Sequence, residues 1–167
     1  RLWAGDNSML IGYRESGVWH NFFEAGAPLF ATDPVADPDH PRRVWATGAD
    51  GTVWTDGVDH HWLKLSGRWV VPIGDRRAWV GGNDGLYRVD MATGTWRRFG
   101  PAVVRKAETG PIGISPDGLL WYSCDGDLCW LDTGTVGAAK PRTGIFHVDI
   151  EPQWGRLPWH PTDGDIR

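Results

Sequence analysis

Short apolar stretches alternate with turn residues along the whole chain. In residues 78–100, apolar and polar positions alternate as they do in β-strands, and turns at 82–85 and 92–94 separate the runs. No window shows the sustained apolar period of 3.6 residues that an amphipathic helix requires. The pattern therefore predicts an all-β protein made of short strands joined by tight turns.

The same order of strands and turns recurs along the chain. Residues 43–54 match residues 77–87 in the order of their apolar and turn residues, and related stretches begin near residues 1, 112 and 157. The turn glycines of four copies, at spacings of 34, 33 and 46 residues, are Gly51, Gly85, Gly118 and Gly164. Because each unit supplies four antiparallel strands, the repeat predicts the blades of a β-propeller.

We expect one propeller domain over residues 1–167, with four four-stranded antiparallel blades and the start of a fifth. The predicted units cover residues 1–40, 43–76, 77–110, 111–153 and 156–167. The last unit stops within its second strand, so we expect the chain to be part of a larger propeller. A closed four-bladed ring and closure by several copies are the alternatives.

The strands within a unit are counted outward from the propeller axis. For the second unit, we predict them at residues 44–47, 52–55, 60–65 and 68–73. The fourth strand of the first unit is predicted at 28–31.

The 12 tryptophans fall in register between the units. Those predicted on the inner strand are Trp3, Trp45 and Trp79. The aromatic residues predicted on the second strand are Trp54, Tyr87 and Trp121, and those on the third are Trp19, Trp62, Trp96 and Trp130. Both faces of a blade pack on its neighbours, so we expect these rings to fill the core between blades. An exposed aromatic cage for a sugar or a cation is the alternative for rings near loops.

Composition narrows the possible partners. The net charge is −4, whereas a phosphate-binding surface needs a basic excess, so we expect no nucleic-acid partner. No apolar run approaches the ~20 residues that span a bilayer, so we expect no membrane insertion. The compartment is not resolved by the sequence.

Three stretches resemble known propeller repeats. Residues 78–90 resemble the repeat of two-component sensor propellers, with the pattern apolar-Trp-x-Gly-Thr-x-x-Gly-Leu-Tyr-Arg. Residues 113–135 resemble the streptogramin lyase and gluconolactonase-type propellers, which carry Pro-Asp-Gly-x-apolar-Trp. Residues 86–99 are similar to the kelch repeat. All three resemblances imply a propeller.

The candidate binding residues lie in the loops that precede the predicted inner strands, because loops carry function more often than cores do. Arg42, Arg76 and Arg156 recur at comparable positions, and their convergence would favour an anionic or carboxylate-bearing partner. Ion pairing along the rim is the alternative. The predicted ligand- or partner-binding residues are Arg42, Arg43, Asp75, Arg76, Arg77, Lys106, Glu108, Trp154 and Arg156.

Cys124 and Cys129 flank an Asp-Gly pair that suggests a tight hairpin. With a two-residue loop, Cys124 faces Asp127 and the two sulfur atoms are diagonal neighbours, whereas a four-residue loop would place them opposite each other. We expect free thiols, with a disulfide as the alternative.

We expect no metal ion and no cofactor. His60 and His61 are adjacent on a predicted strand and therefore point to opposite faces. The Pro- and Asp-rich stretch 31–41 lacks the ligand spacing of a known calcium loop, so we expect a solvated linker there.

No catalytic motif stands out, so we expect a non-catalytic recognition or sensor module of a larger protein, which binds a protein or a small ligand through its loops. Other domains of the polypeptide, or self-assembly, would complete the propeller. One alternative is an enzyme of the streptogramin-lyase or lactonase kind, with His147 or His160 as the first base to test. Another is a Trp-rich lectin of the tectonin type.

Overall fold

The computed structural model describes residues 2–5, 11–22, 34–82, 85–99, 111–124, 127–138 and 140–146. These residues form β-strands, turns and a short 3-10 helix at Thr133–Thr135. None of the helical segments in these ranges is long and apolar enough to cross a bilayer.

The described strands form four antiparallel sheets, which we call blades one to four. Blade one holds β1 (Leu2–Gly5), β2 (Ile11–Glu15) and β3 (Val18–Phe22). Blade two holds β4 (Val35–Ala36), β5 (Val44–Thr47), β6 (Thr52–Thr55) and β7 (His60–Leu63). Blade three holds β8 (Trp69–Gly74), β9 (Arg77–Gly82), β10 (Gly85–Asp90) and β11 (Thr95–Phe99). Blade four holds β12 (Pro111–Ile114), β13 (Leu119–Cys124), β14 (Asp127–Asp132) and β15 (Thr143–Phe146).

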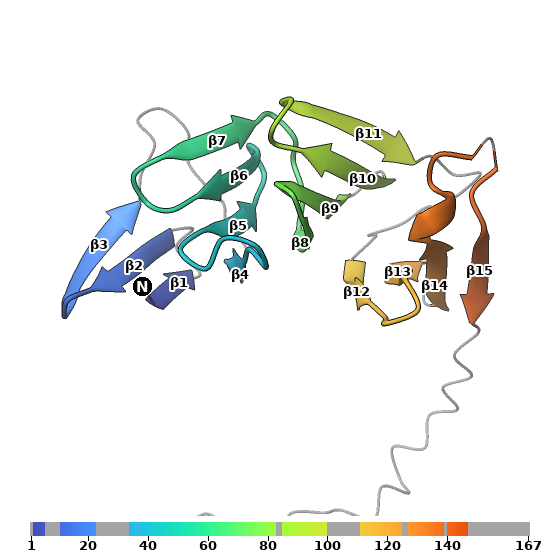
Figure 1. Ribbon diagram of the computed structural model, residues 1–167, viewed down its shortest axis with the longest axis horizontal. Helices are drawn as coiled ribbons and strands as arrows, with labels where there is room; N and C mark the ends of the chain where they lie inside the picture. Colours follow the sequence, from blue (N-terminus) through green and yellow to red (C-terminus); the bar gives the residue numbers. More distant parts are fainter. Residues whose placement is uncertain are drawn as a thin grey trace, which may run out of the picture.

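The four blades stand side by side along an arc (Figure 1). The strands β1, β4, β8 and β12 lie on its concave side, and β3, β7, β11 and β15 lie on its convex side. This is the layout of a β-propeller, so the all-β propeller prediction is confirmed. The predicted strand at 28–31 and the predicted fifth unit at 156–167 lie outside the described residues.

One predicted strand belongs to a different blade. Residues 68–73 were expected to be the fourth strand of the second unit, but β8 pairs with β9 and is the inner strand of blade three. The inner strand of blade two is β4, which lies in the stretch expected to be a solvated linker and pairs with β5. That linker prediction is wrong, because Val35 and Ala36 pair with β5 as a strand of the sheet.

The shift of one strand changes how the repeats align. The four-residue turn 48–51 joins the second strand of blade two, β5, to its third, β6. In blade three the corresponding pair of successive strands is β9 and β10. In blade four, residues 115–118 join the first strand to the second instead. The structural counterpart of β9–β10 is therefore β13–β14, and Trp121 in blade four takes the position of Trp79 in blade three.

The blades pack through a repeated arrangement of side chains. Each blade has a forward face, turned toward the next blade along the chain, and a backward face. The forward face of blade three presents Trp79, Leu86 and Phe99, which pack on Leu120 and Tyr122 of blade four. Blade two presents Trp45 and Trp54 in the same way to Ala78, Val80 and Val89 of blade three. A tryptophan of the second strand thus fills each of these two junctions.

The prediction that all the tryptophans are core is correct in part. Trp45, Trp54 and Trp79 are buried, although Trp45 and Trp79 lie on the second strand rather than the inner one. Trp19 and Trp96 are 53% and 49% exposed, and both lie on outermost strands, β3 and β11.

We predict that Trp79→Ala lowers the free energy of unfolding by ~3–5 kcal/mol, because it empties a buried site between two sheets. Urea titration followed by circular dichroism measures this change. Trp96→Ala is the matched control, since the half-exposed ring should cost under ~1 kcal/mol. Equal losses for the two variants would contradict the assigned packing.

Candidate functional site

Five of the nine predicted binding residues fall in or directly beside two loops. Arg42 and Arg43 precede β5, Asp75 and Arg76 form the turn between β8 and β9, and Arg77 is the first residue of β9. Both loops join the first strand of a blade to the second, so they lie on the same rim of the arc. The other four predicted residues, which are Lys106, Glu108, Trp154 and Arg156, lie outside the described residues.

This rim is opposite to the one that was expected. The residues were predicted to lie in loops that lead from one blade into the next, but the connection from β7 to β8 runs along the other rim. There the amide groups of Gly67 and Arg68 donate to the carbonyl groups of Gly48 and Gly81. Because antiparallel strands alternate in direction, an error of one strand moves every loop to the opposite rim.

A buried carboxylate organises the rim of blade two. The Asp37 side chain accepts hydrogen bonds from the indole nitrogens of Trp45 at 2.9 Å and Trp54 at 2.7 Å. It also accepts from the backbone amides of Asp39 and His40, both at 2.9 Å, and contacts the His40 ring at 3.1 Å. Burial raises the pKa of Asp37, but these hydrogen bonds outweigh it and the pKa lies below its ordinary value.

The ring of Trp54 is surrounded by side chains that carry or can carry positive charge. The Arg43 guanidinium lies 4.0 Å from the ring centroid and the Arg76 guanidinium lies 5.1 Å from it. The rings of His40 and His61 lie 5.3 and 5.2 Å away. We call Arg43, Trp54 and Arg76, with these two histidines, the Trp54 cluster.

The two arginines of the cluster differ in their partners. The Arg43 guanidinium lies 4.0 Å from the Asp56 carboxylate and 3.7 Å from that of Asp59. Arg76 is exposed, and within the described ranges no carboxylate pairs with it. Arg42 is exposed as well. Arg43, rather than Arg42, therefore shares the Trp54 ring with Arg76. Arg76 is the exposed arginine of the cluster, which a ligand can reach.

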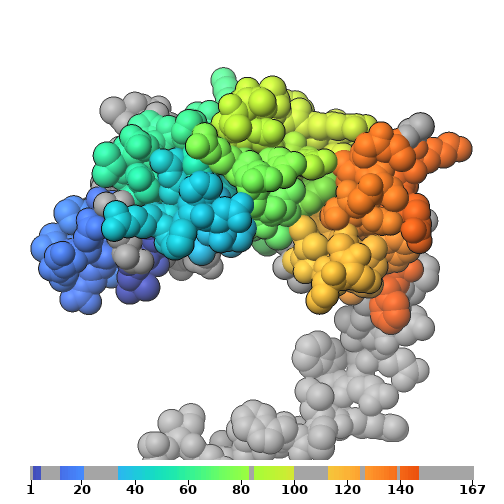
Figure 2. All heavy atoms as spheres, viewed as in Figure 1, coloured from blue at the N-terminus to red at the C-terminus, as the bar shows by residue number. Residues whose placement is uncertain are grey.

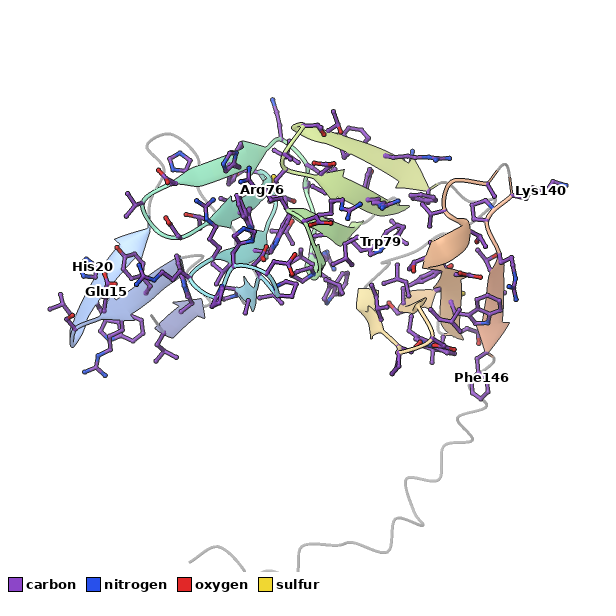
Figure 3. The ribbon with its side chains drawn as sticks, in the orientation of Figure 1. Glu15, His20, Arg76, Trp79, Lys140 and Phe146 are labelled. Carbon is purple, nitrogen blue, oxygen red and sulfur yellow. A yellow bond between two sulfur atoms is a disulfide. The ribbon has the colours of Figure 1, made fainter. Side chains whose placement is uncertain are left out.

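The turn that carries Arg76 has an uncommon backbone. Asp75 and Arg76 have φ angles of 49° and 59°, a left-handed conformation that costs a non-glycine residue roughly 1–2 kcal/mol. Asp39 anchors the turn by accepting a hydrogen bond from the Asp75 amide at 2.7 Å. Gly74 has a φ of 84°, and a Cβ atom there would lie 2.6 Å from the Asp39 carboxylate. Figure 3 shows Arg76 beside blade two, although it belongs to blade three.

The salt bridge of Arg77 lies within the same turn. Its guanidinium donates to the Asp75 carboxylate at 2.6 Å. Arg43 and Arg77 thus form ion pairs at the rim. Ion pairing was the expected alternative for Arg42, Arg76 and Arg156, and within the described ranges no carboxylate pairs with Arg76.

Sequence reasoning missed Asp37 and treated Trp54 only as a core residue. The available signal was the order Asp-x-Asp-His at 37–40, since an Asp that caps amides two and three residues later makes a local turn. The stretch was instead interpreted by its Pro and Asp content alone. In the described ranges, no group of three or more His, Cys, Asp or Glu side chains could hold a metal ion.

The two cysteines form a disulfide, so the expectation of free thiols is wrong. The β13–β14 hairpin has a two-residue loop, and Cys124 faces Asp127 as that geometry requires. Cys124 and Cys129 are diagonal neighbours, with Cα atoms 5.8 Å apart, and the bond forms across this diagonal.

Comparison with solved structures identifies β-propellers. Virginiamycin B lyase from Staphylococcus aureus matches with a TM-score of 0.68 and 13% identity, over 89% of this chain and 52% of that chain. A catalytically inactive variant of that lyase with quinupristin matches with a TM-score of 0.69 and 14% identity, over 88% of this chain and 52% of that chain. Apo AztD from Citrobacter koseri matches with a TM-score of 0.53 and 13% identity, over 84% of this chain and 42% of that chain.

The likeness at these identities establishes the fold alone. The chain spans about half the length of the two lyase structures that it matches. No family model and no curated protein sequence matches the chain.

We predict that Asp37→Asn lowers the free energy of unfolding at pH 7 by about 1.5–3 kcal/mol, because a charged acceptor of buried hydrogen bonds is lost. The folded pKa lies below the ordinary 3.8, so the carboxylate stabilises the fold above that pH. Its contribution is lost as the pH falls through the folded pKa. Urea titrations of the parent and of Asp37→Asn should therefore show that the difference in their free energies of unfolding becomes smaller toward pH 2. A difference that does not depend on pH would contradict this assignment.

A second pair of variants tests the left-handed turn. Arg76→Gly should be at least as stable as the parent, because glycine adopts a positive φ without a steric penalty. Arg76→Val should lose roughly 1–2 kcal/mol, since a β-branched residue fits this conformation poorly. Thermal unfolding measures both, and equal stability of the two variants would show that the turn is not left-handed in solution.

Proposed function

We propose that the chain is a non-catalytic recognition module of a larger protein, and that it binds a carboxylate-bearing ligand or protein partner at the Trp54 cluster. The observation that carries the proposal is Arg76, an exposed cation held over an indole by a turn that is costly to form. Strained backbone persists where the surroundings impose it, and it concentrates at ligand-binding sites.

The chemistry of the cluster favours a carboxylate. A guanidinium presents parallel N–H donors that match the two oxygens of a carboxylate. The Arg76 guanidinium lies within cation–π distance of the Trp54 ring. This contact limits its movement and so lowers the entropy lost on binding. Asp75 is already paired with Arg77, so it leaves the Arg76 donors available to a ligand.

The position of the cluster also suits recognition. It lies on a rim where the β4–β5 loop of blade two meets the β8–β9 turn of blade three, and Asp39 and Asp75 join the two. A partner bound there would contact both blades at once. Loops placed by a rigid scaffold are the usual sites of binding.

The lyase alternative is supported by the likeness of fold and by the resemblance of residues 113–135 to lyase propellers. Both observations concern the propeller fold, which many proteins of different function share. His147 and His160, the first candidates for its base, lie outside the described residues. The Trp54 cluster also holds His40 and His61, but its two arginines and its indole are a set that suits anion binding.

Isothermal titration with citrate at constant ionic strength tests the proposal. We expect saturable binding that Arg76→Gln weakens about tenfold or more, because a hydrogen bond to a charged partner contributes ~1.5–3 kcal/mol. Arg14→Gln, which removes an exposed cation from blade one, is the matched control and should bind as the parent does. Loss of binding in both variants would indicate a general charge effect and would overturn the proposal, as would the absence of any binding by the parent.

A further inference from the structure

In blade two, a row of paired residues crosses the forward face of the sheet and has its own hydrogen-bond acceptor. Trp45 is paired with Trp54, and Trp54 is paired with His61 on the outermost strand. Residues that lie directly opposite each other on neighbouring strands project from the same face. Both indole nitrogens donate to Asp37, which follows the inner strand β4. The two indoles of this row are therefore satisfied inside their own blade.

Blade three has positive charge in the equivalent row. Trp79 takes the position of Trp45 on the second strand, and it is paired with Arg88. Arg88 is paired in turn with Arg97 on the outermost strand. Arginines thus stand in the second and third places of the row, where blade two has an indole and an imidazole.

This row lies where blade three meets blade four. The Arg97 guanidinium donates to the carbonyl group of Val136 at 3.3 Å, and Val136 is buried in the same core as Trp79. The guanidinium also lies 5.2 Å from the centroid of the Phe99 ring. Figure 2 shows blade three, in green and yellow-green, beside blade four, in yellow and orange.

The acceptor that blade two provides has no equivalent in blade three. Ile73 and Gly74, at the bulge that ends β8, stand where blade two has Asp37, and neither side chain can accept a hydrogen bond. The indole nitrogen of Trp79 and the Nε atom of Arg77, two residues earlier on the same face of β9, are buried without a partner among the described residues. Both groups are donors, so this face lacks an acceptor.

The positive charge of the row is also unbalanced. Arg88 and Arg97 lie directly opposite each other, an arrangement of like charges that destabilises a sheet. Within the described ranges, no carboxylate pairs with either of them. Asp90, on the same face, accepts from two amides of the following turn, and Asp75 is paired with Arg77. Arg97 is exposed and Arg88 is half-buried, so a ligand can reach this pair from solvent.

We propose that Arg88 and Arg97 bind a phosphate group at the junction of blades three and four. Two guanidinium groups offer two parallel pairs of N–H donors, and the oxygens of a phosphate can accept from both pairs, whereas a carboxylate has only two oxygens. A phosphate monoester carries a charge of about −1.5 to −2 at pH 7, which balances the two arginines. The site is separate from the Trp54 cluster, which lies at the junction of blades two and three.

Isothermal titration with inorganic phosphate at constant ionic strength tests the proposal. Arg76→Gln is the starting protein, so that the Trp54 cluster does not contribute. We expect saturable binding, which a further Arg88→Gln or Arg97→Gln substitution weakens about tenfold or more. Arg98→Gln is the matched control and should leave binding unchanged, since Arg98 follows Arg97 on β11 and projects from the opposite face.

Two results of this titration would overturn the proposal, namely the absence of binding by the starting protein and an equal loss in the Arg98→Gln control. Acetate tests the class of ligand. It should bind about tenfold or more weakly than phosphate, because it brings two oxygens and one charge to the two guanidinium groups. Acetate that binds as tightly as phosphate would contradict the assignment.

Thermal unfolding separates a binding role of Arg88 from a structural one. Without phosphate, Arg88→Gln should raise the Tm, because it removes one member of a like-charged pair. Phosphate should raise the Tm of the starting protein and have a much smaller effect on the Arg88→Gln variant. A lower Tm of Arg88→Gln without phosphate would show that Arg88 already has a partner within the fold, and the proposal would fail.

Discussion

The packing of a second-strand tryptophan against the next sheet is the interaction on which the rest of the structure depends. Trp45 and Trp79 are buried at the junctions of blade three with blades two and four, each on the forward face of its blade. An indole buries roughly 150–250 Å², more than any other side chain can at such a site. The spacing that it imposes brings the turn of blade three within reach of Trp54 in blade two. The Trp54 cluster exists because that junction is closed.

The sequence was sufficient to predict the repeat, the four units and the tight hairpins, because turn residues and alternating apolar positions are local signals. It was not sufficient to predict which strand lies nearest the axis. In a run of short strands joined by short turns, each strand can pair with the strand before it or with the strand after it. The apolar pattern of β8 is compatible with pairing to β7 and with pairing to β9. The inner strand β4 has two residues and carries almost no pattern. The shift of one strand, and with it the choice of the wrong rim, follows from that ambiguity.

The site was predicted in part for a similar reason. Arg42, Arg76 and Arg156 were selected because they recur before predicted inner strands. Arg76 instead shares the Trp54 ring with Arg43, at an indole between two blades rather than on the propeller axis. Asp37 could not be recognised by composition, since its role depends on two indole donors 8 and 17 residues away in sequence. The exposure of Trp19 and Trp96 could not be foreseen either. A ring on an outermost strand has the same local sequence as one that a neighbouring sheet covers.

Every strand pair among the described residues joins neighbours in sequence. Each pairing therefore closes only a short segment of chain, and its loop-closure entropy is small. A chain of this kind gains its long-range order in small steps, and energetic coupling passes from one sheet to the adjacent one, as in a one-dimensional array. Substitutions in blade four should thus reach the rim of blade two only through blade three, which lets the Trp54 cluster vary without affecting the far end of the arc.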